Sequence, residues 1–338
     1  MSQVAVLAAG MATASGLTAP AACAAFRARI ENFNETRFIS ESGEWIVGAE
    51  VPLPTPWRGL ARHVHLLAGP IRECFEACPN ADPEKTALLL CVAEPERPGR
   101  LAGLDDELPR RLVSVTGYRF AKGSRMLAFG QAGGAVALQG ARELLASGQV
   151  QHVIVAGVDS FLMARTITAY DRQDRLLTPA NSNGFIPGEA GAAVILGKPA
   201  PGSMVLRGIG LGQEKAYLGS GEPLRADGLV GATNGALKEA GIAIQQVNYR
   251  IADITGEQYY FKEAALALVR IQREGGAEPI DVWTPVDCFG HTGAAVVPAM
   301  AAISLDAARK GYAPGPTTMM IATDDRVRRS AIVLSWQG

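Results

Sequence analysis

The run from Phe129 to Gly134 places a glutamine, Gln131, at the start of a predicted helix. It lies between an apolar, strand-like segment (126–129) and a Gly/Ala-rich helical pattern that continues to Ser147. At the first turn of a helix, the helix dipole and free backbone N–H groups stabilise negative charge, as a reactive thiolate requires. The corner holds Gln131, whose amide is not a nucleophile. A structural interpretation also stays open, in which Gln131 only hydrogen-bonds the corner.

His291 is the second residue that could do chemistry. It is flanked by Gly290 and Gly293 on a predicted loop that precedes a helical pattern. A histidine on a glycine-rich loop suits a ligand site better than one on a helix face. It could equally cap the helix that begins near Gly293.

The segment 185–189 contains a second cluster of candidate residues. Pro187 and Gly188 favour a turn, and the carboxylate of Glu189 can accept hydrogen bonds from backbone donors near a site. With Phe185 these residues predict an architectural part of a pocket wall.

A charged loop lies near the end of the sequence. Its residues are Asp324, Asp325, Arg326, Arg328 and Arg329. We interpret it either as a solvated turn or as a partner-binding surface near the mouth of a pocket.

Alternating elements are expected to position these side chains. Apolar strand-like runs are found at 4–9, 86–92, 152–156, 191–196, 204–208, 249–254, 281–285, 318–322 and 330–336. Helical patterns are found at 20–30, 59–78, 131–147, 161–170, 228–240, 258–273 and 293–310. Buried strands that alternate with helices predict an α/β fold whose sheets are covered on both faces. Two similar halves, 1–199 and 200–338, predict a duplicated α/β/α/β/α architecture that forms one compact unit.

Composition excludes several classes of function. The net charge of −1 and the lack of a basic run argue against nucleic acid, and no stretch reaches the roughly 18 apolar residues of a membrane span. The five cysteines have no zinc-site spacing and predict free thiols in a reducing cytoplasm. The glycines at 130–134 lack the Lys-Ser/Thr ending of a phosphate-binding loop. We therefore expect no cofactor and no metal.

Three blocks resemble the β-ketoacyl synthase group of the thiolase superfamily. They are VAGVDS at 155–160, GFIPGEAGAA at 184–193 and GHTGAA at 290–295, with a weaker match in ALKEAG at 236–241. Their order and spacing agree over nearly the whole chain. The resemblance implies a thiolase-like fold of five layers and a site at the 131 corner.

The same resemblance implies that most catalytic groups are replaced. Gln131 stands at the position of the nucleophilic cysteine, and Thr255 at that of the first histidine. Val286 corresponds to the usual lysine, and the charged loop 323–329 to a glycine-rich loop. His291 alone is retained. We therefore predict that cysteine-dependent condensation is absent.

Two classes of function follow from this resemblance. Relatives with glutamine at the nucleophile position are either non-catalytic partner subunits or decarboxylases of malonyl-carrier thioesters. We expect a partner or scaffold subunit, comparable to a chain length factor or to a secretion-associated adaptor. The alternative is an enzyme, either a decarboxylase that uses Gln131, His291 and Thr255 or an acyltransferase whose nucleophile is Cys288 or Thr255. An open pantetheine tunnel that ends at Gln131 would favour the enzyme, and a pocket filled by side chains would favour the scaffold.

The resemblance also implies an assembly. Dimers are expected, either with a second copy or with an active ketosynthase paralogue. An acyl carrier protein or a secretion-system protein is a further expected partner.

Overall fold

The computed structural model describes residues 3–272 and 280–338. Ten strands form a continuous hydrogen-bonded sheet in the order β10-β9-β11-β12-β8-β1-β7-β6-β4-β5, and β2 and β3 form a separate hairpin. The strands are β1 Ala5–Ala12, β2 Asn34–Ile39, β3 Trp45–Gly48, β4 Thr86–Cys91, β5 Arg125–Leu127, β6 His152–Ser160, β7 Glu189–Gly197, β8 Ser203–Gln213, β9 Tyr249–Ala252, β10 Asp281–Trp283, β11 Thr317–Thr323 and β12 Arg328–Gln337. The helices are α1 Ala19–Arg27, α2 Gly59–Ala77, α3 Glu107–Thr116, α4 Gly133–Ala146, α5 Ala164–Asp171, α6 Asp227–Ala240, α7 Gln258–Gln272, α8 Val286–Phe289 and α9 Val296–Arg309.

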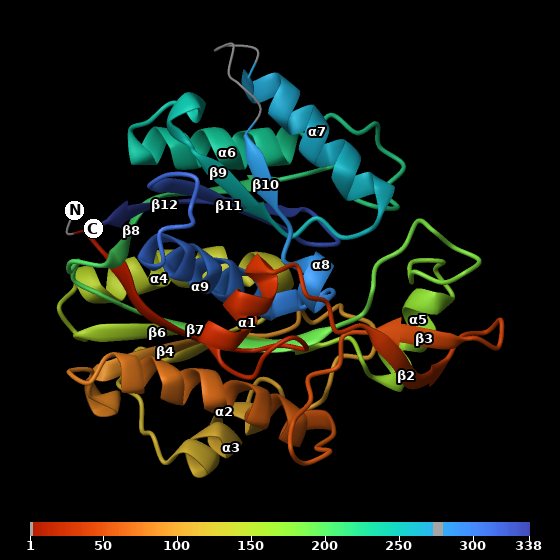
Figure 1. The fold of residues 1–338 in the computed structure, drawn as a ribbon, viewed down its shortest axis with the longest axis horizontal. Helices are drawn as coiled ribbons and strands as arrows, with labels where there is room; N and C mark the ends of the chain where they lie inside the picture. Colours follow the sequence, from red (N-terminus) through yellow and green to blue (C-terminus); the bar gives the residue numbers. More distant parts are fainter. Residues whose placement is uncertain (1–2, 273–279) are drawn as a thin grey trace.

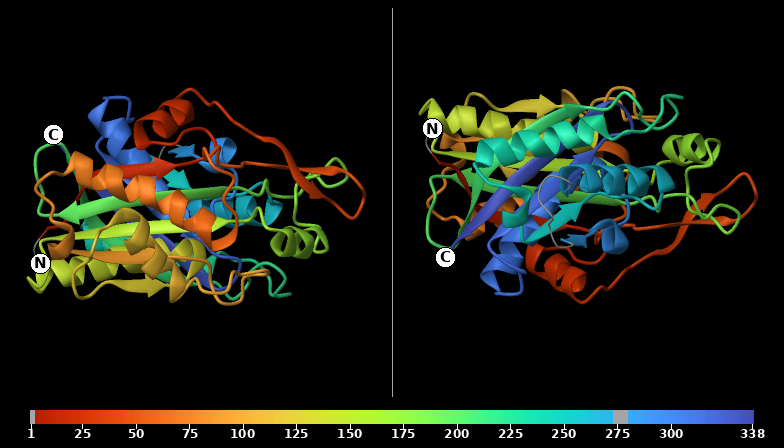
Figure 2. Two further views of the ribbon diagram at one scale, coloured as in Figure 1. Left: turned by 90° about the horizontal axis from the view of Figure 1, so that it is seen from below. Right: turned by 90° about the horizontal axis from the view of Figure 1, so that it is seen from above.

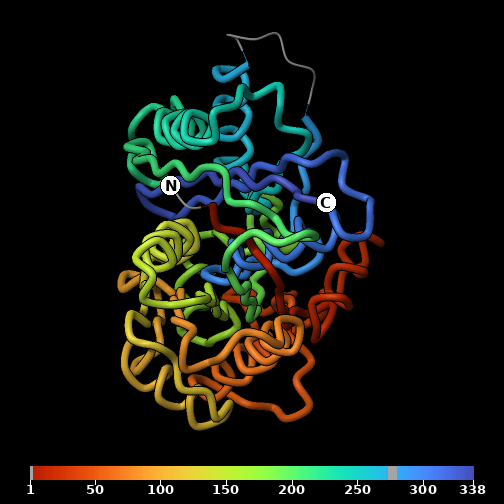
Figure 3. The backbone as a smooth tube through the Cα atoms, turned by 90° about the vertical axis from the view of Figure 1, so that its left-hand side faces the viewer, coloured from red at the N-terminus to blue at the C-terminus, as the bar shows by residue number. Residues whose placement is uncertain are grey.

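Five layers stack on one another, as predicted (Figure 1). Helices α6 and α7 cover the outer face of the strands β8 to β12. Helices α1, α4 and α9 fill the middle layer, and α2 and α3 cover the outer face of the other five strands. Figure 3 shows the same order of layers from the side. The two halves of the sheet meet where β1 pairs with β8, at Ala5 with Val205 and Val6 with Met204.

The middle layer is close-packed because its helices are rich in small residues. Every residue of β7 is buried, and all but three of the fourteen residues of α9 are as well. A Cβ at Gly134 would lie only 2.3 Å from the Cβ of Val297, so a glycine is needed where α4 crosses α9. This contact brings the first turns of the two central helices together.

Two strands and two helices were not predicted from the sequence. The β2–β3 hairpin projects from one end of the molecule (Figure 2), α3 covers α2, and α8 occupies part of a predicted loop. The predicted helices at 161 and 293 begin later, at Ala164 and Val296, because extended residues and a 3-10 turn (Gly293–Ala295) precede them.

The strands predicted at 152–156 and 204–208 continue further, to Ser160 and Gln213, and most other boundaries lie within about three residues of those predicted. Arg273, the predicted last residue of one helix, lies outside the described residues, as do the first two residues of the predicted half 1–199. The division at residue 199 stays a prediction. Within the ranges that the structure describes, no helix is both long and apolar enough to cross a membrane.

Candidate functional site

The predicted corner lies between β5 and α4. A 3-10 turn, Gly130–Ala132, joins the two elements, and Gln131 within it is 2% exposed. Gly130 has a φ of +56°, and a Cβ there would lie 2.3 Å from Oε2 of Glu94. The corner therefore requires glycine at position 130, and it holds Gln131 inside the protein at the first turn of a central helix.

Gln131 and His291 lie side by side in the structure. Nε2 of Gln131 is 3.4 Å from Nε2 of His291, and the backbone N–H of Gly293 donates to Nδ1 of His291 at 3.3 Å. A neutral imidazole that accepts at Nδ1 carries its proton on Nε2. The partner it needs is the Gln131 amide oxygen, which a half-turn of the amide brings to the same place. The pair is thus a neutral donor and acceptor without a nucleophile.

The segment 185–189 holds the histidine loop by its backbone. His291 N–H donates to the carbonyl of Ile186 at 2.8 Å, and Gly188 N–H donates to the carbonyl of His291 at 3.2 Å. A Cβ at Gly188 would lie 2.5 Å from the carbonyl oxygen of Phe289. Close approach of two backbones accounts for the glycine next to Pro187.

Glu189 and two loop glycines lie behind the site. The Glu189 side chain is fully buried, and it accepts from the guanidinium of Arg62, the backbone N–H of Val51 and the hydroxyl of Ser160. Gly290 and Gly293 have φ values of +65° and +52°, which are favourable for glycine. These residues shape the loop, and Glu189 does not contact His291 directly.

Aromatic rings pack against the imidazole of His291. The ring of Phe161 stacks on it at 4.2 Å between centroids, and Phe185 meets it edge-on at 5.0 Å. The guanidinium of Arg97 lies 4.2 Å from the centre of the Phe161 ring and is paired with Glu94 and Asp159. The histidine therefore has an apolar wall on one side, with a buried cation behind that wall.

Thr255 belongs to a second buried ion network. Its hydroxyl donates to Oε2 of Glu257 at 3.2 Å, and Glu257 accepts from Arg175 at 2.7 and 2.9 Å. The same guanidinium donates to Asp325 at 2.7 and 3.0 Å. The hydroxyls of Tyr170 and Tyr260 also donate to Asp325, at 3.2 and 2.8 Å. The Thr255 hydroxyl is therefore committed to a carboxylate.

The charged loop 323–329 is partly buried, so the prediction of a solvated turn is wrong for Asp324, Asp325 and Arg329, and a partner-binding surface at the exposed residues stays a prediction. Asp324 is 2% and Arg329 1% exposed, and Arg329 pairs with Glu263 at 2.7 Å. Asp325 points to Arg175, and only Arg326 and Val327 are exposed. Arg329 pairs with Glu263, 66 residues away in the sequence, and Asp325 pairs with Arg175, 150 residues away. These long-range ion pairs hold the charged side chains inside the protein.

Burial and the neighbouring charges set the protonation of the site. The pKa of His291 is lowered to about 3, chiefly by burial; the charge of Asp325 opposes this shift, and those of Arg97 and Arg175 add to it. Burial alone would raise the pKa of Asp325, but the charge and hydrogen bonds of Arg175 outweigh it and hold that pKa below its usual range. At neutral pH the imidazole is uncharged and the carboxylate is ionised.

A cavity of about 330 Å³ reaches the site from the surface. His291, Thr255 and Phe185 are among the residues that line it, and Gln131 is not among them. The cavity thus ends against Phe185 and the imidazole of His291, and the buried Gln131 does not line it.

Cys288 has the properties of an unreactive thiol. It is 3% exposed, and burial raises its pKa to about 11. All five cysteines are free. A thiolate at Cys288 is therefore disfavoured at neutral pH.

Several residues of the site were not predicted. Phe161, Arg97, Arg175 and Glu257 surround His291 and Thr255, but each comes from a different part of the chain. The only indication of the arginines in the sequence was indirect, because buried acidic residues in the charged loop would need cationic partners.

Comparisons with known proteins agree with this architecture. The model of the beta-ketoacyl synthase N-terminal domain matches residues 130–200. A search of curated proteins gave no match. The ishigamide ketosynthase/chain length factor has a TM-score of 0.80 at 17% identity, with 100% of both chains covered. A ketosynthase in complex with its chain length factor from Xenorhabdus doucetiae has a TM-score of 0.77 at 16% identity, with 99% of this chain and 98% of that chain covered.

A third similar structure is a type II polyketide acyl-carrier protein in complex with its ketosynthase, with a TM-score of 0.79 at 14% identity and 99% of both chains covered. These likenesses extend along the whole fold, and the matched domain contains the corner with Gln131 and the block at 184–193. The chain therefore has the fold of these ketosynthases, and its residues 130–200 match the beta-ketoacyl synthase N-terminal domain.

Proposed function

We propose that this protein is a non-condensing partner subunit of a ketosynthase, comparable to a chain length factor. The observation that carries the proposal is the buried pair of Gln131 and His291. It occupies the corner where a condensing enzyme needs a thiolate, and it contains no group that can accept an acyl chain.

The surroundings of the pair favour a partner over a decarboxylase. Decarboxylation of a malonyl thioester needs donors around the enolate oxygen that forms. The hydroxyl of Thr255 donates to Glu257, so it is not free to take that role. Four carboxylates, those of Glu94, Asp159, Glu257 and Asp325, share two guanidiniums beside the site, which disfavours a further negative charge.

The lining of the cavity supports the same proposal. Phe161 and Phe185 pack on His291, and the cavity that reaches the histidine does not include Gln131 among its lining residues. An acyl chain delivered through this cavity would meet aromatic rings before the corner. We infer that the fold is retained for assembly.

The edge of the sheet offers a surface for that assembly. Strand β5 is the last strand of the ten, and it leads directly into the corner with Gln131. An edge strand has backbone groups that can pair with another chain. Pairing across β5 would place the corner of a ketosynthase beside this one, and two of the similar structures are described as ketosynthase and chain length factor together.

Co-expression with ketosynthase paralogues of the same host tests the proposal. We expect one paralogue to co-purify with this chain and to elongate malonyl-charged carrier protein only in the complex. Replacement of the paralogue's own cysteine by alanine should abolish elongation. A paralogue that elongates equally well without this chain would contradict the proposal.

A further inference from the structure

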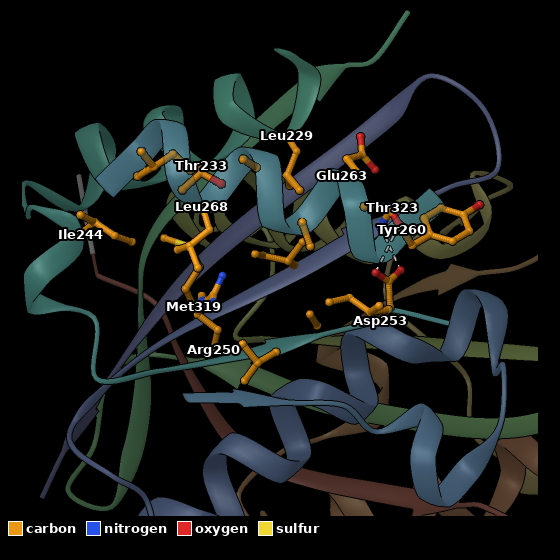
Figure 4. Close-up of a pocket in the computed structure, with 17 residues that line it drawn as sticks. Leu229, Thr233, Ile244, Arg250, Asp253, Tyr260, Glu263, Leu268, Met319 and Thr323 are labelled. Atoms are coloured by element: carbon orange, nitrogen blue, oxygen red, sulfur yellow. Dashed lines mark hydrogen bonds between the residues drawn. The ribbon is translucent and has the colours of Figure 1, made fainter. Parts of the chain in front are cut away.

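Two of the cavities outside the corner differ in the space that they leave for a ligand. One lies between the sheet and helices α6 and α7 (Figure 4), and its free volume of about 30 Å³ holds about one water. The other lies where β2 meets the N-termini of α2 and α5, and it has a volume of about 220 Å³. This second cavity, which we call the α2–α5 cavity, is large enough for a small polyatomic ion.

Two helix N-termini open into the α2–α5 cavity without a side-chain cap. Arg58 and Gly59 line it at the start of α2, and Met163 and Ala164 line it at the start of α5. Neither helix has a capping side chain, and neither has an acidic residue in its first turn. A Cβ at Gly59 would meet no atom within 4 Å, so the space in front of α2 is open. The free N–H groups and the dipoles of both helices therefore favour an anion here.

Arginine side chains add positive charge to the same lining. Arg37, Arg58 and Arg62 line the cavity, and the described residues that line it include no carboxylate. Arg62 is committed to Glu189, and Arg37 lies 3.5 Å from Glu50 in a contact whose side chains are both more than 40% exposed. Arg58 is exposed and forms no ion pair within residues 3–272 and 280–338. The cavity thus has one cation that is free to pair with an anion.

His63 supplies a buried acceptor to the α2–α5 cavity. It is 2% exposed and lines the cavity, and its Nδ1 donates to the carbonyl of Gly59 at 3.1 Å. Burial lowers the pKa of His63, so the ring is neutral at pH 7 and its Nε2 is an acceptor. No hydrogen bond engages this Nε2 within the part of the chain that the structure describes. An unpaired acceptor on so deeply buried a side chain calls for a partner that can donate a proton.

We propose that the α2–α5 cavity binds hydrogen phosphate, a tetrahedral oxyanion that carries one proton. Its ionised oxygens would accept from the first-turn N–H groups of α2 and α5 and from the guanidinium of Arg58. Its O–H would donate to Nε2 of His63. Sulfate has a similar size and charge but no proton at neutral pH, so it leaves Nε2 without a donor. The lining therefore selects phosphate over sulfate.

The site goes beyond the proposed partner role and does not rest on it. The cavity at His291 and the α2–α5 cavity share no lining residue. Phosphate binding can therefore fail while partner binding holds, and the reverse.

Calorimetric titration of the full chain with sodium phosphate, sodium sulfate and methyl phosphate tests the proposal. At about pH 8, inorganic phosphate still carries one O–H, whereas the methyl phosphate dianion and sulfate carry none. We expect phosphate to bind at least tenfold more tightly than either of the other two anions at equal ionic strength. Equal binding of methyl phosphate would overturn the proposal, because it would show that His63 accepts no proton from the ligand.

Three variants separate the parts of the site. Arg58→Met removes an exposed charge and should weaken phosphate binding at least fivefold, whereas Arg110→Met, a matched exposed arginine on α3, should leave it unchanged. His63→Gln provides an amide that can donate as well as accept, so it should bind phosphate and sulfate about equally. A purely structural role of His63 would not change this ratio.

Several results would contradict the inference. They are equal binding of phosphate and sulfate by wild type, unchanged phosphate binding by Arg58→Met, and a preference for phosphate that persists in His63→Gln. The lack of any phosphate binding at about 10 mM would overturn it as well. Because Arg58 is exposed, the Arg58→Met result stands even where His63→Gln fails to fold.

Discussion

Loss of the Asp325 charge should destabilise the protein by an amount that the structure defines. The carboxylate accepts two hydrogen bonds from Arg175 and one each from Tyr170 and Tyr260. Its side chain is 20% exposed and that of Arg175 is 12% exposed. Asp325→Asn retains the shape and removes the charge. Breaking a buried pair costs about 3–5 kcal/mol, and Arg175 keeps Glu257 as a partner, so we expect the low end, about 3 kcal/mol.

For a chain of this length the unfolding entropy is about 0.7 kcal/mol/K, so a loss of 3 kcal/mol lowers the melting temperature by about 4 °C. Thermal unfolding followed by circular dichroism at pH 7 measures this. Glu107→Gln, which removes one partner of an exposed ion pair on α3, is the matched control and should leave the melting temperature unchanged.

The effect has a defined pH dependence. The pKa of Asp325 is lower in the folded protein than in the unfolded chain. Its contribution is therefore complete above the unfolded value of about 3.9 and is lost as pH falls through the folded value. The difference in unfolding free energy between wild type and Asp325→Asn should therefore become smaller as the pH falls. A stability difference that stays constant down to pH about 3, or the lack of any difference at pH 7, would refute the ion network as described.

Three further predictions concern the corner and the central helices. Burial lowers the pKa of His291 to about 3, so its contribution to stability is present above the unfolded value and declines as pH falls. Between pH 7 and pH 5, urea unfolding should show about 2 kcal/mol more loss of stability in wild type than in His291→Asn. Gln131→Cys should not restore condensation, because the Thr255 hydroxyl remains committed to a carboxylate; a mass spectrum and a product assay with malonyl-carrier protein would detect elongation. Gly134→Ala should destabilise the protein by about 1–2 kcal/mol, whereas Gly231→Ala, on an exposed face of α6 with open space around it, should stabilise it by up to about 1 kcal/mol, both measured by urea unfolding.

The strands and helices of the core could be predicted because they carry strong local patterns. The apolar runs at 86–92 and 152–156 correspond to β4 and β6, and the helical pattern at 59–78 to α2. The β2–β3 hairpin could not be predicted in this way. Its apolar residues face both ways, since Ile39 and Trp45 are about half exposed whereas Ile46 is buried, so the hairpin shows no clean alternation of apolar and polar residues in its sequence.

The candidate site could be predicted only in part. The resemblance placed Gln131 and His291 in one site, and the structure brings them to 3.4 Å. The burial of Asp325 could not be foreseen, because its partner Arg175 is 150 residues away and nothing local distinguishes a paired carboxylate from a solvated one. Long-range ion pairs of this kind are decided by the tertiary fold.

The central claim is that the corner with Gln131 does no acyl chemistry. Incubation of the purified chain with malonyl- and acetyl-charged carrier protein, followed by mass spectrometry of protein and carrier, tests it most directly. The account predicts that the masses of the chain and of both carriers stay unchanged, in wild type as in Gln131→Ala and His291→Ala. Release of acetyl-carrier from the malonyl form, lost in both variants, would contradict it and make this protein a decarboxylase.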